Sequence, residues 1–235
     1  MGQDFHHFGT SHWLALAFVF IAGILMVRLM RSDTQEIIKT RVRYVFGSLL
    51  IIAVAMDPVL NFMRYGFTET GWHCFWNSAL PLYLCDIVSI IAAFALFTKN
   101  RYLTEIAYLW AIGGTMQGLL TPTLEFGWRT LEYYNFFLQH GGFPVAAVTL
   151  IWGLKIYPAK GAFRRAIYWS IGYMATVMSY NYFSGQNYGF LNGKPKVEGT
   201  LFDFMGPEPY YLITLNLVAY ALYYILLKIA PSANE

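Results

Sequence analysis

Seven long apolar blocks constrain the fold of this 235-residue sequence more than any other feature. Each block is close to the roughly 20 residues that a helix needs to cross a bilayer. Only 12% of the residues are charged, whereas soluble domains carry about 25%. We therefore predict an all-α, polytopic membrane protein, with residues 1–235 forming one domain, a bundle of seven transmembrane helices. The predicted spans are approximately 12–30, 43–63, 79–98, 103–122, 135–156, 164–184 and 209–229.

The connectors between the blocks predict the orientation. Lysine and arginine concentrate on the cytoplasmic side of membrane proteins. Twelve of the 16 basic residues fall after the first, third and fifth blocks or at the C-terminal end. We therefore expect the N-terminus outside and the C-terminus in the cytoplasm. The first block has no basic stretch before it, so we expect a retained helix rather than a signal peptide. The basic residues form no continuous face, which argues against nucleic-acid binding.

Polar residues gather at one predicted depth of this bundle. Cys85 and Asp86 lie side by side in the outer half of the third span. The other polar residues at this level are His12, Asp57, Asn61, Gln117, His140, Asn181 and Asn187. Ionisable groups are costly in lipid and usually face a cavity or a partner. The pattern predicts a polar cavity in the outer half of the bundle.

Cys85 and His140 are the candidate catalytic pair. Asn77 and Ser78 are suitable N-caps and Pro81 suits a first turn, so the third helix should place Cys85 in its second turn. The positive end of the helix dipole favours a thiolate there, whereas the neighbouring Asp86 carboxylate opposes it. A cysteine nucleophile with a histidine base is the minimum set for covalent acyl transfer.

Other interpretations of the thiol and the imidazole remain open. Cys85 could be a small packing residue, or it could form a disulfide with Cys74 in an oxidising compartment. His140 could simply cap the start of the fifth span.

The charged residues also have structural interpretations. Asp57 and Asp86 could be neutral, or they could pair with Arg64 and Arg129. The N-terminal histidines, His6, His7 and His12, are loosely spaced, so they indicate a metal site only weakly.

Several stretches together resemble a known family. They are LPLYLCDI at 80–87, RYLTEIAYLWAIGGTMQGLLTP at 101–122, HGG at 140–142, and NYGFLNGKP at 187–195 with LFDFMGPEPYY at 201–211. They resemble the YwaF-like integral membrane family, which includes the vertebrate transmembrane protein 164, from about residue 40 to the C-terminus. The resemblance implies a multi-pass helical protein of a cell membrane, here the bacterial plasma membrane. The vertebrate relatives are cysteine-dependent acyltransferases that build ether phospholipids, which places the nucleophile on Cys85 and the histidine on His140.

We therefore expect a lipid-modifying enzyme, a phospholipid acyltransferase or transacylase. Cys85 would hold the acyl group as a thioester, while His140 would move the proton. Asn187 or Gln117 would donate hydrogen bonds to the oxyanion. The predicted substrate-binding residues are Asp57, Asp86, Gln117 and Asn187. Membrane phospholipids are the expected partners, and no metal or nucleotide cofactor is needed. The alternative is a non-enzymatic transporter or binding protein for lipids or small molecules that uses the same cavity.

The connector 186–207 is rich in glycine and proline, yet it carries many apolar side chains. Because a free loop would expose them at a cost, we expect this connector to fold back over the mouth of the cavity. Asn187 would then turn towards Cys85 and His140, and Lys194 and Lys196 would lie near lipid phosphates. Alternatively, the aromatic residues would anchor a mobile loop in the headgroup layer.

Overall fold

The computed structural model describes residues 5–122, 124, 127–195 and 200–231, and all regular elements in these ranges are helical. This confirms the all-α fold. A helix lies at every predicted apolar block: α1 (Thr10–Arg31), α2 (Glu36–Tyr65), α4 (Leu84–Thr98), α5 (Arg101–Gly113) with α6 (Met116–Leu120), α7 (Leu131–Val148), α8 (Ala162–Ser184) and α9 (Tyr211–Ile229).

Three of these helices, α1, α2 and α9, are long and apolar enough to cross a membrane by themselves. A fourth crossing is possible where the short helix α3 (Glu69–Cys74), extended by a π-helical turn to Ala79, precedes α4 at a bend of 74°. The sequence did not predict α3. Its start is capped by Thr68, whose side chain accepts a hydrogen bond from the Gly71 N–H.

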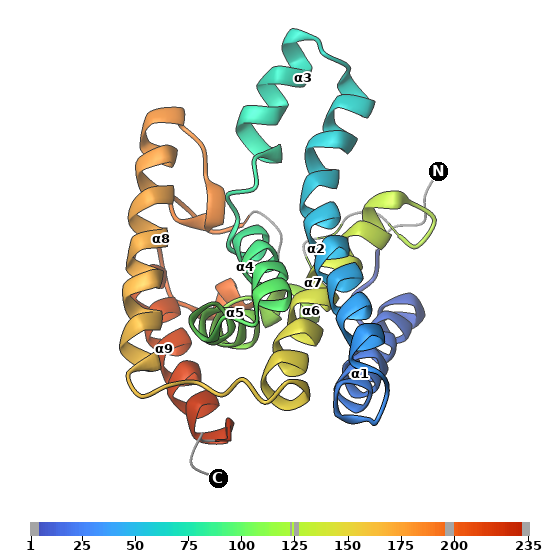
Figure 1. The fold of residues 1–235 in the computed structure, drawn as a ribbon. Coiled ribbons are helices and arrows are strands. Elements are labelled where there is room, and N and C mark those ends of the chain that lie inside the picture. The colour runs from blue at the N-terminus through green and yellow to red at the C-terminus, as the bar shows by residue number, and fades with distance from the viewer. Residues whose placement is uncertain (1–4, 123, 125–126, 196–199, 232–235) are drawn as a thin grey trace.

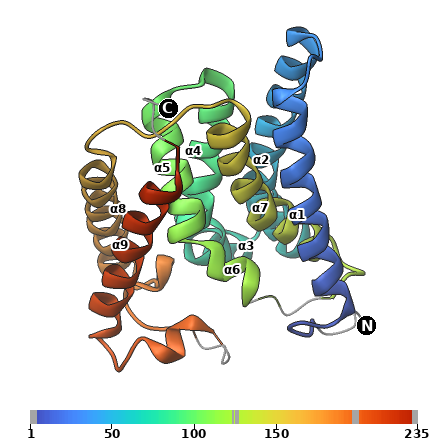
Figure 2. The same cartoon turned by 90° about the horizontal axis from the view of Figure 1, so that it is seen from below.

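The helices form two groups on either side of a central pair. In Figure 1, α1, α2 and α7 lie to one side of α4 and α5, and α8 and α9 lie to the other. Figure 2 shows that the start of α1, helix α6 and the connector after α8 lie at one end of the bundle. The end of α9 and the connector between α7 and α8 lie at the opposite end.

Helix α5 is the centre of the core. Its residues from Thr104 to Ala111 are all buried, since α4, α7, α8 and α9 all pack against it. Only two residues separate it from α4. Lys99 adopts a left-handed conformation with φ of 55°, and the Asn100 side chain then accepts hydrogen bonds from the first N–H groups of α5. This tight turn makes α4 and α5 an antiparallel hairpin.

Helix α4 begins later than the sequence predicts. We expected caps at Asn77 and Ser78, but the π-helical turn Phe75–Ala79 precedes an extended backbone, and α4 begins at Leu84 after the N-cap residue Tyr83. A proline disfavours the helical conformation in the residue before it, so Pro81 holds Leu80 extended. Cys85 therefore lies in the first turn of α4, not the second.

The fourth predicted block is also interrupted. Helix α5 ends at Gly113, and α6 starts only after Thr115. A Cβ atom on Gly113 would lie 2.8 Å from the Tyr223 ring of α9. Glycine at this position therefore allows α9 to approach the end of α5.

Helix α7 begins before the predicted boundary, at Leu131, with the Thr130 side chain as its cap. His140 consequently lies in the third turn and does not cap the helix. The next two residues are glycines, and a Cβ on Gly142 would lie 2.6 Å from the buried Leu50 side chain of α2. The glycines let α7 pack closely on α1 and α2.

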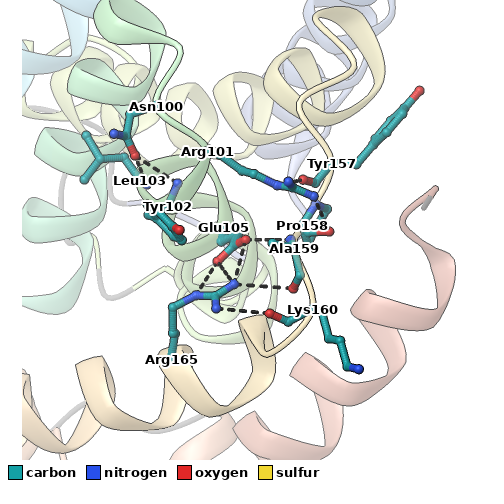
Figure 3. A network of polar contacts seen from close by, with 10 residues as sticks. All are labelled: Asn100, Arg101, Tyr102, Leu103, Glu105, Tyr157, Pro158, Ala159, Lys160 and Arg165. Carbon is teal, nitrogen blue, oxygen red and sulfur yellow. Dashed lines mark hydrogen bonds and ion pairs between the residues drawn. The ribbon is translucent and has the colours of Figure 1, made fainter. Parts of the chain in front are cut away.

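A charged network closes the end of the bundle opposite α6 (Figure 3). Glu105, which is 1% exposed, accepts hydrogen bonds from Arg165 at 2.7–2.9 Å and from the Ala159 N–H at 2.6 Å. Arg101 donates to the backbone carbonyls of Tyr157 and Pro158. Through these bonds α5 holds the connector that leads into α8.

Candidate active site

A cavity of about 450 Å³ lies at the end of the bundle where α4 begins and α5 ends. Helices α2, α4, α6 and α7 form one side, and α8, α9 and the connector 186–207 form the other. The polar and titratable lining residues are Asp57, Tyr83, Cys85, Asp86, Thr115, Gln117, Thr121, Glu132, Asn135, Gln139, His140, Ser170, Tyr173, Thr200, Asn216 and Tyr223. The rest of the lining is largely apolar. The cavity can therefore take a ligand with a polar group and an apolar body.

Five of the six predicted site residues line this one cavity. They are Asp57, Cys85, Asp86, Gln117 and His140. They come from α2, α4, α6 and α7, so the fold brings together residues that are far apart in the sequence.

Cys85 is partly buried on the cavity wall in the first turn of α4. Both Cys85 and Cys74 are free thiols. The disulfide that the sequence left open is therefore wrong for this structure. A thiol at this position remains available for chemistry in the cavity.

Asp86, the neighbour of Cys85, organises the start of α4. Its carboxylate accepts a hydrogen bond from the Tyr83 N–H at 3.1 Å and another from the Gln139 amide at 2.7 Å. The residue is only 4% exposed. Asp86 therefore fixes the turn that carries Cys85 and links it to α7.

Asp57 has a matching amide partner. The Asn135 side chain donates at 3.1 Å to the Asp57 carboxylate and at 3.1 Å to the Ala53 carbonyl. Arg64, which the sequence offered as a partner for a buried carboxylate, instead bonds to Glu132 at 2.6 Å. Asp57 itself is exposed on the cavity side of α2.

Sequence reasoning missed Asn135 and Gln139. They are four residues apart and therefore share one face of α7, which is the face that lines the cavity. Two amides at this spacing in an apolar segment are the signal that could have revealed them. Their N–H groups satisfy the two carboxylates that α2 and α4 bring into the bundle.

His140 is held with one ring nitrogen available. Its ring stacks on Phe136 with centroids 3.9 Å apart, and Nδ1 lies 3.1 Å from the Phe136 carbonyl. A carbonyl only accepts, so Nδ1 carries the proton and Nε2 keeps its lone pair. Gly118 makes room for the ring, because a Cβ there would lie only 3.1 Å from the His140 Cδ2 atom. Among the described residues, no hydrogen bond joins this imidazole to Cys85.

The amino-acid sequence was compared with protein families, curated proteins and solved structures. A model of the TMEM164 family matches residues 7–227. The chain belongs to the TMEM164 family. The predicted resemblance is thereby confirmed, and family membership agrees with the apolar helices in indicating a membrane protein. No curated protein matches the chain, and no solved structure matches it.

In this TMEM164 family member the Gln117 amide, which was expected to donate to the oxyanion, already bonds to the backbone. Its side-chain N–H donates to the Gly114 carbonyl at 2.6 Å, at the break between α5 and α6. One donor of the amide is therefore used to hold the end of α5.

Arg129, the other arginine considered as a carboxylate partner, lies over the Trp128 ring.

Asn187 is placed differently from the expectation. Its side chain donates to the Gly193 carbonyl at 2.9 Å and accepts from the Asn192 N–H at 2.8 Å. It is not among the residues that line the cavity. The expected orientation towards Cys85 is wrong, because an asparagine in a glycine-rich loop bonds readily to nearby backbone groups.

The described parts of the connector 186–207, residues 186–195 and 200–207, do fold back onto the bundle. Tyr188 and Leu191 are buried, and Phe190, Leu191 and Phe202 line the cavity. Phe204 is an exception, at 83% exposed. The expectation that most of these apolar side chains pack on the bundle is confirmed. The expected placement of Lys196 lies outside the described residues.

Two polar side chains anchor this connector. The buried Asn181 amide bonds to both the N–H and the carbonyl of Tyr188, at 2.9 Å each. The Tyr188 hydroxyl then bonds to the Leu80 N–H and the Trp76 carbonyl at 3.2 Å. The connector is thereby tied to the backbone that leads into α4 and Cys85.

The remaining polar residues at this level have structural partners. Asn61 donates to the Gly71 carbonyl. His12 accepts from the Phe8 N–H and bonds to the Leu119 carbonyl, which uses both ring nitrogens. Within the described residues, no group of three or more histidine, cysteine or acidic side chains is arranged to hold a metal ion.

Proposed function

We propose that this TMEM164 family member is a phospholipid acyltransferase or transacylase that works through a thioester on Cys85. The observation that carries the proposal is that Cys85 and His140 line one cavity whose remaining wall is mostly apolar. An apolar wall suits an acyl chain, while the polar residues suit an ester group.

The reaction would have two half-reactions. In the first, the Cys85 sulfur attacks the ester carbonyl, and the carbon–oxygen bond to the lipid alcohol breaks. His140 Nε2 takes the thiol proton and returns it to the leaving oxygen. In the second, the hydroxyl of an acceptor lipid loses its proton to Nε2 and attacks the thioester, which releases the thiolate. The thiolate then recovers the proton from His140.

Asp86 and Gln139 would act as positioning residues for this chemistry. Their 2.7 Å hydrogen bond joins the turn that carries Cys85 to the helix that carries His140. Asp57 faces the same cavity and would contact the polar part of the substrate. Asp57 has only one amide partner among the described contacts, so its second oxygen can accept a substrate hydroxyl.

We also propose that the apolar helices form seven spans, with the N-terminus outside. The basic residues support this arrangement through the positive-inside rule. Impermeant thiol labelling of intact cells, with single cysteines introduced into the 32–35 and 192–195 segments, would test it. Labelling should occur only at 192–195, and labelling at 32–35 would overturn the orientation.

Transport or binding of a small molecule is the second candidate function. It is favoured by the two carboxylates in the cavity, because ionisable groups at membrane depth often mark a transport pathway. This alternative predicts that the protein transports a ligand across a membrane, or binds it, without forming any covalent intermediate.

Intact-mass analysis tests the enzyme directly. Purified wild-type protein is incubated with diacyl phospholipid, and a fatty-acyl mass adduct is expected. Cys85→Ser should abolish the adduct, while the matched control Cys74→Ser should retain it. An adduct that persists in Cys85→Ser, or wild-type protein that never acquires one under conditions of measured acyl transfer, would refute the thioester.

A further inference from the structure

Tyr83 carries a hydroxyl group that the packing of its ring does not explain. The residue precedes α4 as its N-cap, two positions before Cys85, and it is half-buried on the cavity wall. Its ring packs against Tyr188 and Phe190 of the connector 186–207, with centroids 5.0 and 5.8 Å away. These contacts use the ring, and a phenylalanine could make them equally well.

The start of α4 does not need the hydroxyl either. No side-chain bond caps the helix at Tyr83, whose backbone carbonyl instead accepts from the Asp86 and Ile87 N–H groups at 3.0 and 3.3 Å. The Asp86 carboxylate completes the turn by accepting from the Tyr83 N–H. Among the described residues, the Tyr83 hydroxyl has no hydrogen-bond partner and is not sealed inside the protein. It is therefore open to a ligand on a residue that lines the cavity.

The other hydroxyl groups of the described cavity wall are used or enclosed. Those that donate to backbone carbonyls, at 3.0–3.2 Å, belong to Thr115, Thr121 and Tyr173. The hydroxyls of Ser170 and Tyr223 lie 3.5 Å from each other. Thr200 Oγ1 is fully enclosed. Tyr83 is thus the hydroxyl on this wall that can donate to a bound molecule without losing a protein partner.

Tyr83 also lies close to the proposed nucleophile, since it is within electrostatic range of Cys85. The donors that the sequence suggested for an oxyanion are engaged elsewhere. Gln117 bonds to the Gly114 carbonyl, and Asn187 is not among the residues that line the cavity. An acyl transfer at Cys85 still requires a donor for the oxygen that becomes charged, and the free Tyr83 hydroxyl fits this role.

We propose that the Tyr83 hydroxyl is a catalytic group that donates a hydrogen bond to the ester carbonyl oxygen while Cys85 attacks. As the carbon–sulfur bond forms, the carbonyl π electrons move to the oxygen, and Tyr83 stabilises this anion without transferring its proton. When the carbonyl re-forms, the bond to the lipid alcohol breaks and His140 returns the thiol proton to the leaving oxygen. The Cys85 N–H can act as a second donor, because the first N–H groups of a helix lack helical acceptors. This inference rests on the thioester of the proposed function.

Single-turnover acyl transfer tests the hydroxyl. Purified protein is mixed with excess dioctanoylphosphatidylcholine, and the fatty-acyl adduct is followed by intact mass against time. Tyr83→Phe keeps the ring and should form the adduct about 100-fold more slowly than wild type, as expected for the loss of one oxyanion donor. Tyr182→Phe removes a hydroxyl from an 81% exposed residue of α8 and should not change the rate. Equal rates for Tyr83→Phe and wild type would overturn the inference.

The infrared spectrum of the accumulated acyl-enzyme reports the hydrogen bond itself. An isotope label on the acyl carbonyl carbon isolates the thioester stretch in a difference spectrum. A hydrogen bond lowers the frequency of this stretch, so Tyr83→Phe should move the band to higher frequency, while Tyr182→Phe should leave it in place. A purely structural role of Tyr83 predicts the same frequency in Tyr83→Phe and wild type, and that result would also refute the donor.

Thermal unfolding shows whether the hydroxyl holds the fold. Tyr83→Phe should melt at the wild-type temperature, because the hydroxyl has no partner among the described residues. A marked drop would show that the hydroxyl has a structural partner and would overturn the inference. A wild-type adduct that Tyr83→Phe forms at the same rate would remove the oxyanion donor and leave the thioester standing, whereas a wild type that forms no adduct would refute both.

Discussion

Replacing Arg165 by methionine should destabilise the bundle strongly. The Arg165 guanidinium donates three hydrogen bonds at 2.7–2.9 Å to Glu105, which is 1% exposed. Methionine keeps most of the apolar stem but leaves the Glu105 charge buried, with the Ala159 N–H as its one remaining donor among the described residues. Breaking a buried ion pair from one side costs about 3–5 kcal/mol. At about 2–4 °C per kcal/mol for a chain of this size, the melting temperature should fall by about 6–20 °C.

Thermal unfolding of detergent-purified protein would measure this change. Arg164→Met is the matched control, because Arg164 is the adjacent exposed residue of α8 and its loss should change the melting temperature little. The double variant Glu105→Gln with Arg165→Met should recover part of the loss, since it removes the uncompensated charge. If Arg165→Met melts within 1 °C of the control, or if the double variant is less stable than the single one, the reasoning about the buried charge is wrong.

Three further substitutions test the packing around the cavity. Gly142→Ala should lower the free energy of unfolding by about 1–3 kcal/mol, because the new methyl group overpacks against Leu50. In the double variant with Leu50→Ala, the loss of stability should be smaller than the sum of the losses in the two single variants. Strictly additive losses would contradict the close contact. Asn181→Leu should speed amide hydrogen exchange at Tyr188, because both backbone groups of that residue lose their partner; unchanged exchange would show that the connector is anchored elsewhere. Gln139→Leu should lower the free energy of unfolding by about 1–3 kcal/mol, because the buried Asp86 carboxylate keeps the Tyr83 N–H but loses its amide donor. It should also change the rate of maleimide labelling of Cys85; an unaltered labelling rate would mean that this amide does not position the thiol.

The sequence predicted the helices well because apolar length is a strong signal. Every predicted block contains a helix, and five of the six proposed site residues meet in one cavity. Family membership is confirmed over residues 7–227. The cavity residues could be predicted because a polar side chain in an apolar segment usually faces a cavity or a partner rather than lipid.

The sequence was a poor guide to the places where helices break. Pro81 was expected in the first turn of a helix but lies in the extended segment before α4. The Leu80 N–H there bonds to the Tyr188 hydroxyl of the connector, and the Leu82 carbonyl accepts from the Tyr173 hydroxyl of α8. Asn187 was assigned to the cavity from its position in the chain, yet its amide bonds within its own loop. Such outcomes depend on tertiary hydrogen bonds, which periodicity and composition do not encode.

If the cavity binds lipids as proposed, the hairpin of α4 and α5 would limit which lipids it can reach. The two helices have 15 and 13 residues, so at 1.5 Å per residue they are about 20–22 Å long. The hydrocarbon core of a bilayer is about 30 Å thick, and both helices end at the cavity. In the proposed seven-span arrangement the cavity would therefore occupy the remaining depth on one side, within a single leaflet. Lipids of the opposite leaflet would have to be flipped by another route before this protein could bind them, so its action would follow the lipid asymmetry of the membrane.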